Sequence, residues 1–128
     1  MATIREAGYV YCGEEDGAVI VGFADKQFGT EQYVLLQRLK AASDEERDSG
    51  DGEVHITIDD QSRSKYGGIR TVEVAPGVVR IHLEQESARL LDTDDEIVIR
   101  FLASESEHDA MVDCLKDLVS GTQSRILI

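Results

Sequence analysis

The residues best suited to do chemistry in this chain are carboxylates gathered into short clusters. We expect all of these clusters in turns or at strand ends, where two interpretations stay open. Dispersed clusters would only keep the protein soluble, whereas clusters that lie close together would form a negative patch that attracts and selects basic partners. The clusters are Glu14-Glu15-Asp16, Asp44-Glu45-Glu46 with Asp48, Asp51 and Glu53, Asp59-Asp60, and Asp92 with Asp94-Asp95-Glu96.

The metal-ligand patterns in the sequence are incomplete. A calcium-binding EF-hand loop needs glycine at its sixth position and glutamate at its twelfth. Counted from Asp44, those positions hold Ser49 and His55. The three histidines do not have the spacing of a metal site, and we interpret His55 and His82 as residues on the solvated faces of two strands. We therefore predict no metal and no other cofactor.

Patterns for nucleophilic catalysis or phosphate binding are also missing. His108 and Asp109 lie close to several serines, but a role in capping the start of a helix accounts for Ser104. The pair Gly67-Gly68 precedes a predicted strand, whereas a phosphate-binding loop leads into a helix. We interpret the pair as a structural turn, and we predict that the protein is not an enzyme.

The overall charge narrows the classes of partner. The 128 residues include 26 acidic and 13 basic side chains, which gives a net charge of -13. Such a chain repels nucleic acid and anionic lipid, and it meets basic surfaces more often. With 41% apolar residues the sequence can form a core. We expect one domain over residues 1–128 that binds neither nucleic acid nor a membrane.

The cysteines and the N-terminus bear on the compartment. Cys12 and Cys114 could form one disulfide, but we favour two reduced, small core residues. The first residues do not have the pattern of a signal peptide. The longest apolar run, residues 18–24, is too short to cross a bilayer. A cytoplasmic location is the expectation.

The first two-thirds of the chain have the patterns of β-strands. Alternation of apolar and polar residues is clearest in 54–59 and 78–84. Ala75-Pro76-Gly77 predicts a hairpin turn between 69–74 and 78–84. For 33–39 a short helix competes with a strand. The remaining predicted elements are strands within 4–13, 18–24 and 97–101, a helical turn at 86–91, and surface loops at 25–30 and 43–52.

One helix near the C-terminus completes the prediction. Ser104 and Glu107 have the spacing of a capping box, and Gly121 is suited to end the helix. Apolar residues recur on one side of this segment, which predicts an amphipathic helix. The expected fold is α+β, a meandering and mostly antiparallel sheet with the C-terminal helix packed on one face. The apolar positions are Met111, Val112, Leu115, Leu118 and Val119.

An ordered set of segments resembles immunity protein family 10 of bacterial polymorphic toxin systems. The resemblance covers about residues 5–120. It implies a small cytosolic antidote that binds and blocks the catalytic domain of a toxin encoded beside it, without catalysis of its own. The segments are Val21-Gly22-Phe23-Ala24-Asp25, residues 31–38, Tyr66-Gly67-Gly68-Ile69, residues 88–91 and residues 97–101.

The charge and the resemblance together suggest a cognate toxin with a basic face, such as a nuclease. An acidic inhibitor can fill a basic cleft by imitating phosphate charge. A generic acidic interaction module or accessory subunit is the alternative, and a small enzyme or ligand-binding domain is a third. A homodimer formed through a strand edge also stays open. The predicted contact residues are Asp44, Glu45, Glu46, Asp48, Asp51, Asp59, Asp60 and, as an aromatic anchor, Tyr66.

Overall fold

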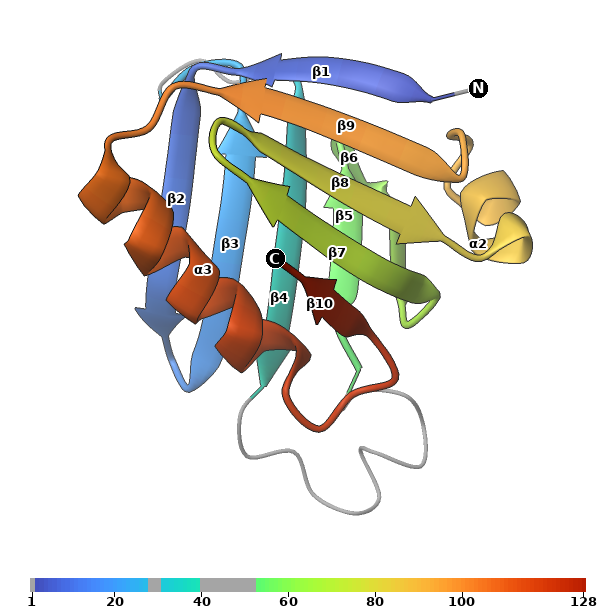
Figure 1. Cartoon of the computed structure of the whole chain (residues 1–128). Coiled ribbons are helices and arrows are strands. Elements are labelled where there is room, and N and C mark those ends of the chain that lie inside the picture. The colour runs from blue at the N-terminus through green and yellow to red at the C-terminus, as the bar shows by residue number, and fades with distance from the viewer. Residues whose placement is uncertain (1, 28–30, 40–52) are drawn as a thin grey trace.

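The computed structural model describes residues 2–27, 31–39 and 53–128 (Figure 1). In this part of the chain the strands form two sheets, each with five strands. The predicted α+β class, the mostly antiparallel pairing and the C-terminal helix are confirmed. The division of the strands between two sheets is a feature that the sequence analysis did not predict.

The first sheet, sheet B, is an antiparallel meander. Its strands follow the chain in the order β2-β3-β4-β5-β6. Asp16 and Gly17, both with positive φ, form the tight turn between β2 and β3. The segment at 33–39 is a strand rather than a helix, because its first four residues alternate between half-buried and buried. The bounds are β2 Tyr9–Glu15, β3 Ala18–Ala24, β4 Tyr33–Leu39, β5 His55–Ile58 and β6 Asp60–Tyr66.

The second sheet, sheet A, has the order β1-β9-β8-β7-β10. The predicted hairpin is confirmed, with Gly77 at positive φ in the turn between β7 and β8. Both edge strands run parallel to their neighbours, β1 to β9 and β10 to β7. The bounds are β1 Thr3–Ala7, β7 Ile69–Ala75, β8 Val78–Leu83, β9 Glu96–Phe101 and β10 Arg125–Leu127.

Glycines mark two of the places where the chain passes from one sheet to the other. Gly8 separates β1 from β2, and a Cβ atom there would clash with the carbonyl oxygen of Asp25. Gly67 and Gly68 separate β6 from β7, and both have positive φ. Two sheets can each bury one apolar face against the other, which a single long meander cannot do.

The two described helices agree with the sequence. Helix α2 spans Gln85–Leu90, and helix α3 spans Glu105–Val119. Ser104 Oγ accepts the Glu107 N–H at 3.2 Å, and the Glu107 carboxylate accepts the Ser104 N–H at 3.1 Å. The predicted capping box is therefore confirmed, as is the positive φ of Gly121. All five apolar residues of the predicted stripe are buried.

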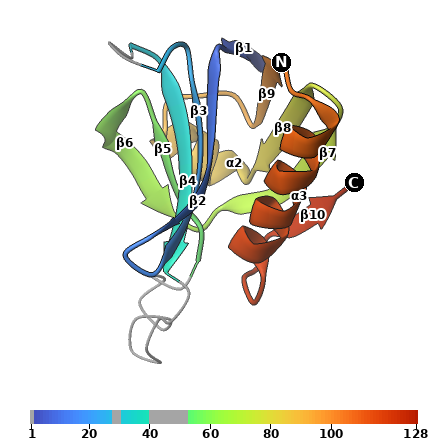
Figure 2. The same ribbon diagram turned by 90° about the vertical axis from the view of Figure 1, so that its left-hand side faces the viewer.

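The core lies between two layers. Sheet B forms one layer, and sheet A with α3 beside it forms the other (Figure 2). The rings of Phe23 and Phe101 meet across the layers, with centroids 5.9 Å apart. Leu36, Ile56, Ile81 and Leu115 are fully buried between them. No described helix or strand lies over the other side of sheet B.

Candidate partner-binding surface

The predicted contact residues divide into two groups. Three of them, Asp59, Asp60 and Tyr66, lie on or beside the β5–β6 hairpin of sheet B. The other five lie outside the described residues, namely Asp44, Glu45, Glu46, Asp48 and Asp51.

Asp59 is a joint between the two sheets. It follows β5 with a positive φ of 64°, beside a bulge in the β5–β6 pairing. Its carboxylate accepts two hydrogen bonds from the Arg5 guanidinium, one of them at 2.8 Å, and Arg5 belongs to β1 in sheet A. It also accepts the backbone N–H of Tyr33 at 2.9 Å and lies 3.4 Å from the Arg63 guanidinium. The hydrogen bonds from Arg5, above all, hold the pKa of Asp59 below its usual value.

Asp60, the next residue, has a different environment. Its side chain is exposed, and one carboxylate oxygen accepts the backbone N–H of Ser62 at 2.9 Å. That hydrogen bond lowers the pKa of Asp60, so the group is charged at neutral pH. Asp60 can therefore present its charge to a partner, whereas the charge of Asp59 is already compensated by Arg5.

Tyr66 is the last residue of β6, and the residue is 45% exposed. Its ring contacts the ring of His55, with centroids 4.5 Å apart, and His55 Nδ1 lies 3.3 Å from the Gln37 amide. Burial lowers the pKa of His55, which keeps the imidazole neutral at pH 7. His55 and Tyr66 thus form an uncharged aromatic pair on the outer face of sheet B, and the Gln37 amide contacts the His55 ring.

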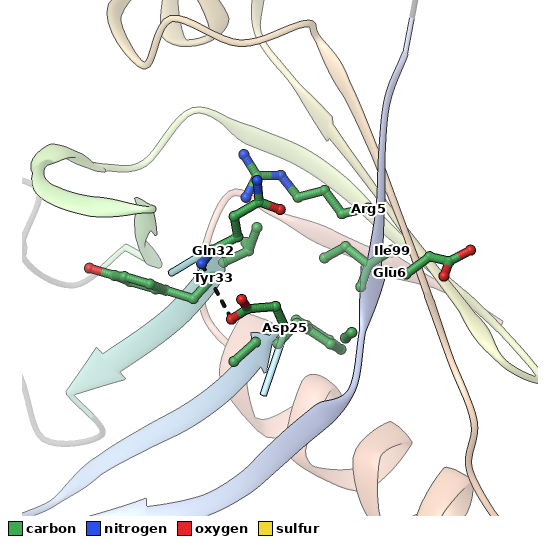
Figure 3. Close-up of a pocket in the computed structure, with 10 residues that line it drawn as sticks. Arg5, Glu6, Asp25, Gln32, Tyr33 and Ile99 are labelled. Carbon is green, nitrogen blue, oxygen red and sulfur yellow. Dashed lines mark hydrogen bonds between the residues drawn. The ribbon is translucent and has the colours of Figure 1, made fainter. Parts of the chain in front are cut away.

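A small cavity lies next to the Asp59 joint (Figure 3). Arg5 reaches along it toward β4, whereas Glu6 points to the other side of β1. Asp25 accepts the backbone N–H groups of Glu31 and Gln32, at 3.2 and 3.3 Å. Burial acts to raise the pKa of Asp25, but these N–H donors outweigh it, so the pKa lies below its usual value. The cavity measures about 10 Å³, the space of one water molecule, so it cannot hold a substrate.

The acidic clusters at 14–16 and 92–96 are not brought together. The first lies at the β2–β3 turn, at one end of sheet B. The second follows α2 and leads into β9 of sheet A, on the opposite side of the molecule (Figure 1). A single patch formed by these two clusters is therefore excluded.

The histidines and cysteines form no site in the described part of the chain. His55 lies in sheet B, whereas His82 lies in sheet A, 3.3 Å from the carboxylate of Glu73. Cys12 and Cys114 are both free, and burial raises the pKa of the Cys12 thiol to about 12. Among residues 2–27, 31–39 and 53–128, no group of three His, Cys, Asp or Glu side chains could hold a metal ion. Neither α2 nor α3 is long and apolar enough to cross a bilayer.

Comparison with known protein families identifies the family of this chain. The family model described as Immunity protein 10 matches residues 3–109. The chain belongs to the Immunity protein 10 family. The match includes β1 to β9 and the first turn of α3, while most of α3 and all of β10 follow it. No curated protein gives a significant match.

Sequence alone singled out only one of the four tyrosines of this immunity protein. Tyr9, Tyr11 and Tyr33 lie on the outer face of sheet B, the same face that carries Tyr66. Strand alternation was a signal that could have placed Tyr9 and Tyr11 on one side of β2. The pairing of β2 with β3, and of β3 with β4, was needed to place Tyr33 on the same face in the same row as Tyr9.

Proposed function

We propose that this member of the Immunity protein 10 family binds a cognate toxin domain and neutralises it stoichiometrically. The observation that carries the proposal is the family match over residues 3–109. An immunity protein acts by occupying a surface of its toxin, so the chain needs a recognition surface and no reaction centre of its own. The proposal includes a single domain that works in the cytoplasm, where an antidote meets a toxin before export.

The charge of the chain supports a toxin with a basic face. A net charge of -13 speeds encounter with a positive surface and makes that encounter sensitive to salt. Basic clefts are typical of proteins that act on nucleic acids, so a nuclease toxin fits this charge. In the proposed interface the acidic residues within 44–51 and Asp60 face the toxin, with Tyr66 as an anchor. Asp59 would act indirectly, because its carboxylate is bonded to Arg5.

Growth rescue in a bacterial host tests this function. The polypeptide encoded beside this gene is expressed alone and then together with the immunity protein. We expect the neighbouring product to stop growth and co-expression to restore it. As a matched control, an unrelated acidic protein of similar size and charge should give no rescue. Toxicity that persists at high levels of the folded immunity protein would refute the proposal.

A further inference from the structure

The outer face of sheet B is uncharged over three consecutive rows of paired residues. Backbone pairing places residues that face the same side directly opposite one another. None of the positions in these rows is an aspartate, glutamate, lysine or arginine. The rows are Tyr9–Ala24–Tyr33, Tyr11–Gly22–Leu35–Thr57–Ser64 and Gly13–Ile20–Gln37–His55–Tyr66, and together they define the tyrosine face.

The tyrosine face contains all four tyrosines of the chain. Tyrosine combines a large apolar ring with a hydroxyl group, and it is enriched at the centres of protein interfaces. Ile20 and Leu35 lie between the tyrosines and are only half-buried. A strand face in contact with water would carry charged and polar residues instead.

Sheet A shows that contrast within the same molecule. On its outer face Glu6 lies opposite Arg100, and Glu73 lies opposite Arg80. These cross-strand pairs of opposite charge are typical of a face in contact with water. The lack of charge on the tyrosine face is therefore a property of that face and not of the whole surface.

The shape of the tyrosine face also suits a ligand. The small residues Gly22 and Ala24 of β3 lie between the larger side chains of β2 and β4. A hollow opens over them, lined by Tyr9, Tyr11 and Leu35 among others. In Figure 2, sheet A and α3 lie on the core side of sheet B. No described helix or strand lies over the other side, which carries the tyrosine face.

Charges at the border of the face indicate what kind of protein it receives. Glu15 and Asp16 border it at the β2–β3 turn, and both are exposed. Lys26 follows the end of β3 and Glu31 precedes the start of β4, and both lie at the edge of the face away from the β2–β3 turn. A second copy of the chain would bring another charge of -13 against this border, which like-charge repulsion disfavours. A protein with a basic border and an apolar centre is complementary to it.

We propose that the tyrosine face of sheet B is the surface that docks the toxin domain, with an apolar group of the toxin filling the hollow over Gly22. This assignment rests on the proposed function and adds to it the location of the contact. The border carries three acidic residues and Lys26, so its net negative charge orients the basic partner, and the tyrosines supply the contact area from which water is excluded.

A substitution in the hollow separates docking from folding. In Gly22→Gln a polar side chain would fill the hollow. A Cβ atom at Gly22 lies 3.4 Å from the end of the Leu35 side chain and meets no backbone atom, so the strand can accept it. The matched control is Ala75→Gln, which places the same side chain at an exposed position on the outer face of sheet A. Thermal unfolding of both variants checks that the fold is kept.

The probe is the purified toxin domain encoded by the neighbouring reading frame, and calorimetry gives the dissociation constant. We expect Gly22→Gln to weaken binding by about 30-fold or more, as loss of an interface hot spot does, and to lose growth rescue. Ala75→Gln should bind and rescue as the natural chain does. If Gly22→Gln does not fold, the double variant Tyr11→Ser, Leu35→Ser replaces it with the same expectation.

The other outcomes overturn the assignment in distinguishable ways. Unchanged binding by the folded Gly22→Gln variant would exclude the tyrosine face while leaving the immunity function intact. Failure of the natural chain to bind or rescue would reject the proposed function and this assignment together. Sedimentation that shows a dimer of the natural chain, dissociated by Gly22→Gln, would assign the face to a second copy and exclude the toxin as its occupant.

Discussion

Two adjacent aspartates show how much a residue's role depends on its neighbours. Asp59 and Asp60 are identical in type, yet one joins the sheets through Arg5 and the other faces solvent. Asp59→Asn keeps the shape and tolerates the positive φ, but it removes the charge that Arg5 needs. We expect it to lower the free energy of unfolding by about 1–2 kcal/mol, as measured by urea denaturation. Asp60→Asn is the matched control and should change it by less than about 0.5 kcal/mol.

The same residue predicts how stability responds to acid. The folded-state pKa of Asp59 lies below its unfolded value, so its stabilising effect is complete above the unfolded pKa. That effect is lost as the pH falls from about 4 through the folded-state pKa. Asp59→Asn should therefore lose less stability than the natural chain does on acidification below about pH 4. Identical acid profiles of the two proteins, followed by circular dichroism, would contradict the role of this carboxylate.

Sequence could not reveal the joint at Asp59. The pair Asp59-Asp60 follows an alternating strand, and such a position predicts two solvated acids at a strand end. The partner, Arg5, lies far away in the chain and in the other sheet. Only the folded arrangement of the two sheets brings the Arg5 guanidinium to the carboxylate of Asp59, between β5 and β6.

Among the elements, helix α3 depends most directly on local sequence. Its capping box satisfies two backbone N–H groups, one through each side chain. Ser104→Ala should lower the free energy of unfolding by about 1 kcal/mol. Ser104→Asp keeps an acceptor at the same place and should be close to neutral in the same chemical denaturation experiment. An alanine variant as stable as the natural chain would show that tertiary packing alone holds the helix start.

The turn that leads from sheet B to sheet A offers a comparison between two glycines. Gly68 and Gly17 both have positive φ, 86° and 78°. A Cβ atom at Gly68 would clash with the buried side chain of Ser87, whereas nothing lies near one at Gly17. Gly17→Ala should cost only the backbone strain, about 1 kcal/mol. Gly68→Ala should cost clearly more in thermal unfolding, and equal losses would argue against the close packing of α2 on this turn.

The existence of most elements was predictable, but their grouping was not. Alternation defines which side of a strand is apolar, and it identified β5, β8 and β9, while the turn at 75–77 identified β7. It does not say which strands share a sheet, because that depends on where the chain crosses between layers. Two strands lack the signal altogether. The seven residues of β6 are polar, and β10 has only three residues and pairs with β7 at an edge.

At the scale of the whole molecule, the proposal of a toxin with a basic face predicts that charge governs the rate of association. Reversing Asp44, Glu45 and Glu46 to lysine should slow association by about tenfold or more at low salt, without loss of stability. The rate of the variant should also depend less on salt than that of the natural chain. Stopped-flow mixing with the toxin domain measures both effects.

The control for this experiment reverses the same number of charges on the exposed side of α3. Glu105, Asp109 and Asp113 are exposed there. Each reversal adds two positive charges, so both triple variants carry a net charge of -7 instead of -13. If the two variants slow association equally, net charge alone controls the rate, and residues 44–46 have no special place in the interface.

The central claim is that this immunity protein silences a toxin by remaining bound to it. The most direct measurement is a titration of toxin activity, with fixed toxin and increasing amounts of the purified chain. We predict that residual activity falls in proportion to the amount added and reaches zero at a fixed molar ratio, with inhibitor and toxin eluting together. Complete silencing by a small fraction of an equivalent, or no silencing at any ratio, would contradict the account.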